Sequence, residues 1–170
     1  MKTREELIKH YVAMISKHSR EVYNLMLFLL DNKEKLSLDL DDWDIIERAY
    51  KHDIDKINRD YVNAVIDVYY FSDTKNSTEM ARLESTIREH KLEQPHHVQC
   101  HDKNCTPISD IDICEMCCDW VSSVKRHQIV DDEVGAAKEF YFNRCEDFPI
   151  LKEKENKFLE VFDLLNNYSA

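Results

Sequence analysis

Apolar residues near the start of the chain recur every three or four positions from Leu7 to Leu29. This period is that of one face of an α-helix, so the pattern predicts a long amphipathic helix. Thr3 and Glu6 have the spacing of a capping box, which predicts that the helix begins just after Thr3. His18 falls on the same apolar stripe, and we therefore expect its side chain to point towards the interior.

The rest of the chain gives the same kind of signal, with helix caps and breaks between apolar stretches. A second helix should open at Asp41 or Asp42 and end at the dipeptide His52-Asp53. Further helices are expected from about Arg59, from an N-cap at Ser77 through roughly His90, from an N-cap at Ser109, and on either side of Pro149. No repeat divides the chain. The pattern thus predicts an all-α fold, a single-domain bundle of six to seven helices over residues 1–170.

Composition excludes several classes of enzyme. Gly135 is the only glycine, whereas glycine-rich phosphate loops and nucleophile turns need several residues without a Cβ. This excludes P-loop, Rossmann and α/β-hydrolase chemistry. The longest uninterrupted apolar run, Leu25 to Leu30, is too short to cross a membrane, and the N-terminal segment is charged. We therefore expect a cytoplasmic protein with no membrane partner.

The charge of the chain argues against binding to a nucleic-acid duplex. The formal net charge is −11, whereas a surface for the phosphate backbone needs a basic face. Tyr69, Tyr70, Phe71 and Tyr141 follow helical apolar spacing, so we expect these rings in the core and not on a stacking surface. A small anionic ligand is compatible with this charge if metal ions supply positive charge locally. The sequence leaves the oligomeric state open.

The six cysteines are expected to stay reduced, and the adjacent Cys117 and Cys118 are poorly placed for a disulfide. One interpretation is a structural zinc site, for which the chain offers Cys100, Cys105, Cys114 and Cys117, with His96, His97 or His101 as substitutes. Another is that Cys114 and Cys117, which lie inside the helix predicted from Ser109, are small buried apolar residues. A cysteine nucleophile is disfavoured, because the neighbouring carboxylates would raise the pKa of the thiols.

Several ionisable residues occupy positions where burial would be unfavourable without a partner. They are His18, the dipeptide His52-Asp53 with Lys56 one turn later, the histidines His90, His96, His97 and His101, and Asp119. Each has a structural explanation as well. A lone inward histidine is commonly a hydrogen-bonded core residue. The strip formed by Asp112, Glu115, Asp119, Ser122 and Arg126 has the spacing of a solvated helix face.

Taken together, these residues favour a metal site. Histidines and aspartates from separate helices can converge in the core of a helical bundle. Such nitrogen and oxygen ligands suit one or two divalent ions of Mn, Fe, Co, Ni, Mg or Zn. Consecutive residues on a helix differ by about 100° in direction, so only one of His96 and His97 is expected to bind a given ion.

The order His18, His52-Asp53, Asp119 resembles the H…HD…D signature of the HD-domain superfamily of metal-dependent phosphohydrolases. HDIDK is similar to the HD-x-G-K form of several branches, with Asp55 where glycine is usual. More closely, HDIDK, HKLEQPHH and ICEMCCDW resemble the HD-x-S-K, H…HH and E-M-x-x-D-W elements of a small HD-like family of bacterial and viral proteins of unassigned function. The resemblance covers roughly residues 14 to 165, and for a viral member it implies the host cytoplasm.

The resemblance implies a ligand set for one or two ions. Four residues would hold the first ion, namely His18, His52, Asp53 and Asp119. His90 and one of His96 or His97 occupy the interval in which two-metal HD proteins place additional histidines.

The implied reaction is hydrolysis of a small phosphorylated metabolite or nucleotide by a metal-bound hydroxide. Asp53 and Lys56 would be catalytic, and Lys56, Arg88 and Lys91 would bind the substrate. In the mononuclear nucleotidase branch a catalytic glutamate matches the position of Lys56, so the chain departs from that branch.

Two other functions are compatible with the same residues. Some HD-superfamily members with an HD-x-x-K lysine use two irons to activate dioxygen, and nitrogen and carboxylate ligands suit both kinds of metal. A degenerate HD scaffold could also serve as a non-catalytic ligand-binding or interaction protein. The presence of every position of the H…HD…D set favours a functional centre.

Overall fold

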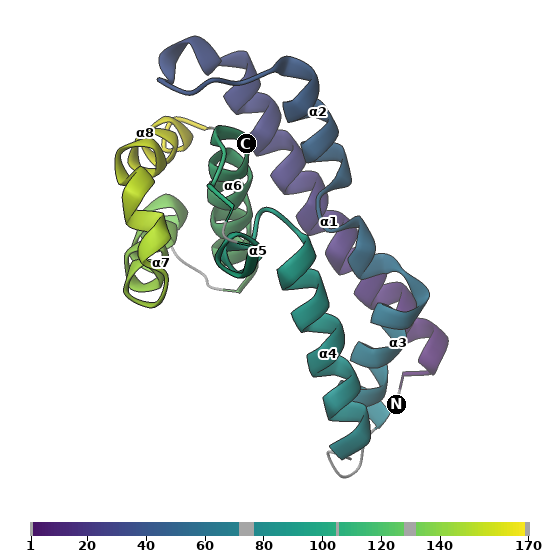
Figure 1. Ribbon diagram of the computed structural model, residues 1–170. Helices are drawn as coiled ribbons and strands as arrows, with labels where there is room; N and C mark the ends of the chain where they lie inside the picture. Colours follow the sequence, from purple (N-terminus) through teal and green to yellow (C-terminus); the bar gives the residue numbers. More distant parts are fainter. Residues whose placement is uncertain (1, 72–76, 105, 128–131, 169–170) are drawn as a thin grey trace.

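The computed structural model describes residues 2–71, 77–104, 106–127 and 132–168. Within these ranges the chain forms eight α-helices and no strand (Figure 1). The α-helices are α1 (Arg4–Asp31), α2 (Asp42–Lys51), α3 (Arg59–Ile66), α4 (Ser77–Glu93), α5 (Val98–Asn104), α6 (Asp110–His127), α7 (Glu133–Asp147) and α8 (Glu155–Leu165). The prediction of an all-α fold is confirmed.

Short helices of other types connect the α-helices. Three are 3-10 helices, η1 (Lys33–Lys35), η2 (Ile54–Ile57) and η4 (Pro149–Lys154), and one is a π-helix, η3 (Asp67–Phe71). None of the described helices combines the length and the apolar composition of a membrane-spanning segment.

The helix boundaries follow the caps expected from the sequence. Thr3 and Glu6 form the capping box at the start of α1, and the Asp41 side chain accepts hydrogen bonds at the start of α2. Ser109 and Asp112 bond reciprocally at the start of α6. The Ser77 side chain lies outside the described part of the chain, so its expected role as an N-cap stays a prediction.

The number of α-helices is eight in the described chain, where six or seven were expected. The additional helix is α5, in a stretch that contains Pro95 and many polar residues. Seven residues are too few for a helix to be stable by local propensity alone. Val98 and His101 are buried, and this tertiary contact holds α5 in place.

The aromatic residues after α3 differ from the expectation. Tyr141 is buried as expected, but Tyr69, Tyr70 and Phe71 are exposed. They lie in the π-helix η3. The i→i+5 winding of a π-helix moves these residues off the stripe that an α-helix would have continued.

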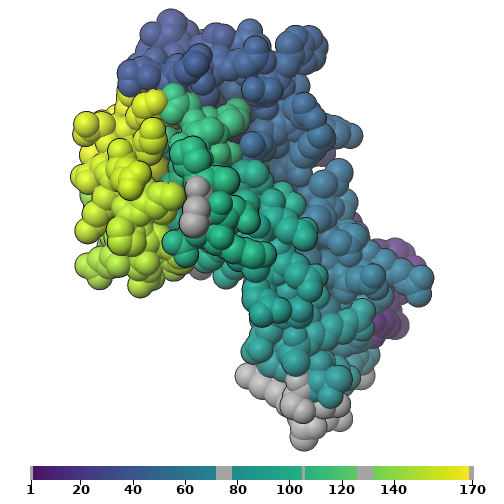
Figure 2. Space-filling model, viewed as in Figure 1, coloured from purple at the N-terminus to yellow at the C-terminus, as the bar shows by residue number. Residues whose placement is uncertain are grey.

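Helix α1 connects two apolar parts of the molecule. Its C-terminal half joins α2, α6, α7 and α8 in the large core, whereas its N-terminal half packs with α3 and α4 in two smaller clusters. Figure 1 shows α3 and α4 beside the N-terminal half of α1 and α6 beside the other half, with α7 and α8 on the far side of α6. Figure 2 shows the α3 and α4 end as a narrower extension of the broad body. The predicted site residues lie where these two parts meet.

Candidate metal centre

The predicted ligands come from five separate segments. His18 lies on α1 between the residues of the smaller clusters, which end at Val12, and those of the large core, which begin at Val22. The other predicted ligands are the pair His52-Asp53 after α2, His90 on α4, His96 and His97 between α4 and α5, and Asp119 on α6. All of them are buried except His97, which is half-buried. The structure thus brings every predicted metal ligand into one polar layer between two apolar parts.

A local backbone feature lets adjacent His52 and Asp53 both face this layer. His52 is the C-cap of α2, and Asp53 has the left-handed conformation, with φ 58° and ψ 14°. It is the one non-glycine residue with positive φ among those described. This conformation reverses the chain after α2, as a residue at this position of a helix end commonly does. The sequence pattern predicted that α2 ends at this dipeptide. It did not predict the left-handed conformation of Asp53.

The first group of potential ligand atoms joins α1, α2 and α6. His18 Nε2 lies 3.0 Å from Asp119 Oδ1, 3.5 Å from Asp53 Oδ2 and 3.3 Å from His52 Nε2. His52 Nε2 is 3.7 Å from Asp53 Oδ2 and 3.6 Å from Asp119 Oδ1. Ligand atoms about 2.0–2.2 Å from a divalent ion are about 3.0–3.5 Å from one another. The group therefore has close to the spacing that one ion requires.

The second group lies on the other oxygen of Asp53. Asp53 Oδ1 is 3.4 Å from His90 Nε2 and 3.4 Å from His96 Nε2. His97 Nε2 is 2.8 Å from His90 Nε2. Nitrogens of the three histidines lie within 4.8 Å of one another. Asp53 thus offers one carboxylate oxygen to each group.

Both His96 and His97 approach the second group, although only one was expected to bind a given ion. The expectation holds for consecutive residues of a helix, whose directions diverge. Here the two residues lie in the turn between α4 and α5. The centres of their rings are 4.3 Å apart.

Buried polar atoms of the second group lack partners. Among the described residues, Asp53 Oδ1 and both ring nitrogens of His96 have no hydrogen bond of acceptable geometry. A buried polar atom without a partner is unfavourable by about 1–3 kcal/mol. Asp53 Oδ1 and His96 Nε2 face one another at 3.4 Å, and a carboxylate oxygen and a ring nitrogen without partners fit a site for a cation.

The Nδ1 atoms of three of the potential ligand histidines are held by hydrogen bonds to neighbouring side chains. His52 Nδ1 donates a hydrogen bond to Glu115 at 3.0 Å, and His90 Nδ1 donates to Asp55 at 2.7 Å. His18 Nδ1 is hydrogen-bonded to the Ser122 hydroxyl at 2.9 Å. Partners on Nδ1 fix the orientation of a metal-binding imidazole and direct its Nε2 to the ion. His18, His52 and His90 therefore have the outer contacts that are typical of metal-binding histidines.

Glu115 is a residue of the site that the ligand prediction did not include. Its Oε1 is 3.0 Å from His52 Nδ1 and 3.2 Å from His96 Nδ1. Its Oε2 accepts a hydrogen bond at 2.9 Å from Arg48, which also binds Asp112 at 2.8 Å. The sequence contained a signal for it, because Glu115 lies one helical turn before Asp119 and begins the E-M-x-x-D-W element.

The polar strip of α6 is buried and not a solvated face. Asp112, Glu115, Asp119 and Ser122 are all less than a tenth exposed. The interpretation as a solvated face is therefore wrong for these four residues, while the Arg126 side chain is outside the described part. The reason is tertiary, since the histidines and Arg48 supply partners that the local sequence does not reveal.

Contacts with the histidines keep the carboxylates of this layer ionised. Burial opposes ionisation of Asp119, but hydrogen bonds from His18 and His52 hold its pKa well below the usual range. Burial likewise opposes ionisation of Glu115, yet its contacts with His52 and His96 lower its pKa to about 2. The carboxylates are thus anionic and prepared for cations.

The histidines divide into two kinds. Burial disfavours the protonated form of His52, but its hydrogen bonds to Asp119 and Glu115 and the charge of Asp53 raise its pKa to about 10. Burial and the neighbouring His96 lower the pKa of His97 to about 2. His97 is therefore neutral and able to offer a lone pair, whereas an ion must displace a proton from His52.

The predicted substrate residues lie in different places. Lys56 is partly buried, and its Nζ is 2.8 Å from Asp53 Oδ2. Lys91 lines a pocket beside the centre, whereas Arg88 is exposed and is not among the residues of that pocket. Lys56 is thus a neighbour of the carboxylate shared by both groups.

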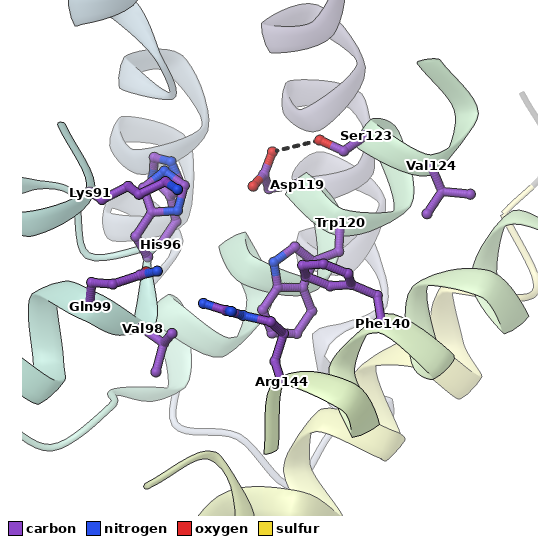
Figure 3. A pocket seen from close by; sticks show the side chains of 11 residues that line it. Lys91, His96, Val98, Gln99, Asp119, Trp120, Ser123, Val124, Phe140 and Arg144 are labelled. Atoms are coloured by element: carbon purple, nitrogen blue, oxygen red, sulfur yellow. Dashed lines mark hydrogen bonds between the residues drawn. The ribbon is translucent and has the colours of Figure 1, made fainter. Parts of the chain in front are cut away.

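A pocket of about 420 Å³ opens beside both ligand groups (Figure 3). Three potential ligands are among its lining residues, namely His96, His97 and Asp119. The remaining residues come from the start of α5 and from α4, α6 and α7, and they are Lys91, Val98, Gln99, Trp120, Ser123, Val124, Phe140 and Arg144. Arg144 was not predicted, and no nearby motif marks it in the sequence.

The alternatives based on cysteine receive no support from the described residues. No described cysteine belongs to a group that could hold a metal, and Cys105 lies outside the described ranges. Burial raises the pKa of Cys114 to about 12, so its thiol stays protonated. His101 donates a hydrogen bond to the Pro95 carbonyl at 2.8 Å and is a core histidine outside both ligand groups.

A comparison with protein families matches residues 7–163 to DUF5662, a family of unknown function. The chain belongs to this family. The matched range contains all the potential ligands from His18 to Asp119, together with the pocket residues up to Arg144. No curated protein and no solved structure matches the chain. The family carries no assigned activity, so function has to be argued from the centre itself.

Proposed function

We propose that the protein is a metal-dependent phosphohydrolase that acts on a small phosphorylated metabolite or nucleotide. One observation carries the proposal: Asp53 presents one oxygen to the group formed with His18 and His52, and the other to the group formed with His90 and His96. A carboxylate shared in this way suits two neighbouring ions. Paired ions are typical of enzymes that hydrolyse phosphate esters. The order of these residues along the chain supports the resemblance to HD phosphohydrolases.

The residues of the centre would have different roles in this reaction. Three residues would hold the first ion with Asp53, namely His18, His52 and Asp119, and the histidines His90, His96 and His97 would hold the second. Bound divalent ions would supply Lewis acidity and lower the pKa of water. Lys56 beside Asp53 would limit the negative charge that a phosphoryl group meets on approach.

The position of the pocket supports a small anionic substrate. Its lining includes potential ligands of both groups, and Lys91 and Arg144 are the cationic residues of its wall. In a chain of net charge −11, two cations beside a metal centre form a local site for an anion. A phosphoryl group placed there would lie against the metals and the cations at once.

The first test is metal content followed by turnover. Untagged wild-type protein, His52→Ala and Asp53→Ala are purified in parallel with His10→Ala, which removes an exposed histidine of α1. We expect one or two equivalents of a transition metal in wild type and His10→Ala, and a loss of metal in the other two. The metal-loaded wild type should hydrolyse p-nitrophenyl phosphate or a nucleoside monophosphate, and both site variants should not.

Other outcomes identify the other functions. Turnover that requires dioxygen and iron would replace the hydrolase by a di-iron oxygenase. Tight binding of a nucleotide without product would indicate a ligand-binding protein. Unchanged turnover in folded His52→Ala or Asp53→Ala would refute the proposed centre.

A further inference from the structure

The pocket beside the centre has two chemically different walls. Figure 3 shows His96 on one side and the aromatic rings of Trp120 and Phe140 on the other, with Asp119 between them; His97 and Val124 also line the pocket. A site for phosphate alone would need only the first wall. The aromatic wall therefore indicates what the rest of the ligand is.

Trp120 is held rigidly in this wall. Its ring stacks on Phe158 inside the core, with ring centres 5.9 Å apart and an angle of 12° between the planes. It follows Asp119 directly on α6, so the ring and the potential ligand are fixed by the same helix. Figure 3 shows its indole nitrogen directed into the pocket. A rigid aromatic surface binds a flat ring with little loss of side-chain entropy.

Phe140 completes the aromatic wall from α7. Its ring meets Trp120 edge to face with centres 5.6 Å apart, and the residue is 44% exposed. An apolar ring that is partly open to solvent offers apolar surface, and a ligand that covers this surface gains free energy by removing it from water. Phe142, on the same helix, is similarly exposed but does not line the pocket.

Arg144 lies one helical turn after Phe140 and faces the same pocket. Its guanidinium lies over the Phe148 ring at 4.5 Å and contacts Asp147 at 3.2 Å. These contacts hold the side chain in position, and Figure 3 shows it extending across the pocket. A positioned guanidinium with free donors is well suited to an anionic oxygen.

We propose that the pocket selects phosphate esters whose organic part is an aromatic ring, with Phe140 and Trp120 contacting the ring and Arg144 an anionic oxygen. The inference rests on the phosphoryl-binding centre of the proposed function. The volume of about 420 Å³ suits one small molecule. Phe140 and Arg144 are then specificity-determining residues that α7 adds to the centre.

Binding can be measured without turnover by using phosphonates, whose carbon–phosphorus bond is not a phosphate ester. The Mn²⁺-loaded protein is titrated with phenylphosphonate and with ethylphosphonate in a calorimeter. We expect phenylphosphonate to bind wild type about tenfold more tightly. Phe140→Ala should remove this preference and leave ethylphosphonate unchanged, whereas the matched control Phe142→Ala should change neither. Arg144→Gln should weaken both ligands by about tenfold, and Arg82→Gln, on the exposed face of α4, should not.

The outcomes separate this inference from the proposed function. Equal affinity of wild type for the two phosphonates, or binding of neither, overturns the inference. So does a Phe140→Ala variant that keeps the aromatic preference. A clear preference for phenylphosphonate together with no hydrolysis of phenyl phosphate would support the aromatic selectivity of the pocket and refute the proposed hydrolase activity. Hydrolysis of alkyl and phenyl phosphates at equal rates, with equal phosphonate affinities, would support the hydrolase and overturn the inference about the aromatic ring.

Discussion

Oε1 of Glu115 lies 3.0 Å from Nδ1 of His52. The same oxygen is 3.2 Å from Nδ1 of His96, so one carboxylate oxygen faces a histidine of each ligand group. Arg48 holds the second oxygen at 2.9 Å. Glu115 is thus a positioning residue that connects the two halves of the centre.

Glu115→Gln should weaken metal binding at both groups. The amide keeps the shape but loses the charge that orients His52 and His96, and loss of such an outer contact commonly lowers metal affinity about 10- to 100-fold. Equilibrium titration with Mn²⁺ or Co²⁺ measures the effect. The control is Glu47→Gln, which changes an exposed glutamate of α2. Unchanged affinity in a folded Glu115→Gln protein would contradict the positioning role.

Asp55→Asn should affect the second group only. Asp55 accepts the 2.7 Å hydrogen bond from His90 Nδ1, and among the described residues its carboxylate groups with Asp53 and His90 but not with His18 or His52. We expect about tenfold weaker binding of the second metal equivalent, with the first retained. Metal stoichiometry by equilibrium dialysis distinguishes the two sites. Asp60→Asn is the control, because the Asp60 carboxylate is exposed and pairs with Arg82, not with a histidine of the centre. Equal loss of both equivalents would argue against two separable sites.

Asp53→Gly should give a more stable metal-free protein than Asp53→Ala. Both variants remove the carboxylate, so they differ mainly in how they tolerate the left-handed φ of 58°. Alanine in this conformation is disfavoured relative to glycine by about 1 kcal/mol. Urea unfolding measures the difference. At Glu84, exposed within α4, the order should reverse, since alanine is the better helix former. The same order at both positions would contradict the left-handed turn.

The metal-free protein should lose stability as the pH rises from about 6.5 to about 10. The folded state holds the pKa of His52 at about 10, above the ordinary value of 6.5. A raised histidine pKa stabilises the fold fully below the ordinary value, and this contribution disappears as the pH passes the folded value. Thermal unfolding at several pH values tests this.

Two comparisons make this pH effect specific. His52→Gln should flatten the alkaline decline in thermal stability, whereas His10→Gln, at an exposed position of α1, should not. Metal-loaded protein should show a smaller decline, because an ion holds the imidazole in its neutral form. A decline of equal size in His52→Gln would assign it to another group.

The local sequence already determined much of this molecule. Hydrophobic period placed His18 on the inner face of α1, and caps located the starts of α1, α2 and α6. The end of α2 at His52-Asp53 was also correct. These features depend on interactions between residues a few positions apart, and such interactions can be predicted from the sequence.

Only the tertiary structure decided which polar residues meet. Glu115 became a partner of His52 and His96 because α6 packs beside the end of α2, and Arg144 entered the pocket because α7 packs on α6. The short helix α5 and the joint approach of His96 and His97 depend likewise on burial against distant segments. Burial requires each polar group to find a partner, and that partner is supplied by whichever helix lies opposite. The sequence determined the helices and their inward residues, while packing between helices decided the composition of the centre.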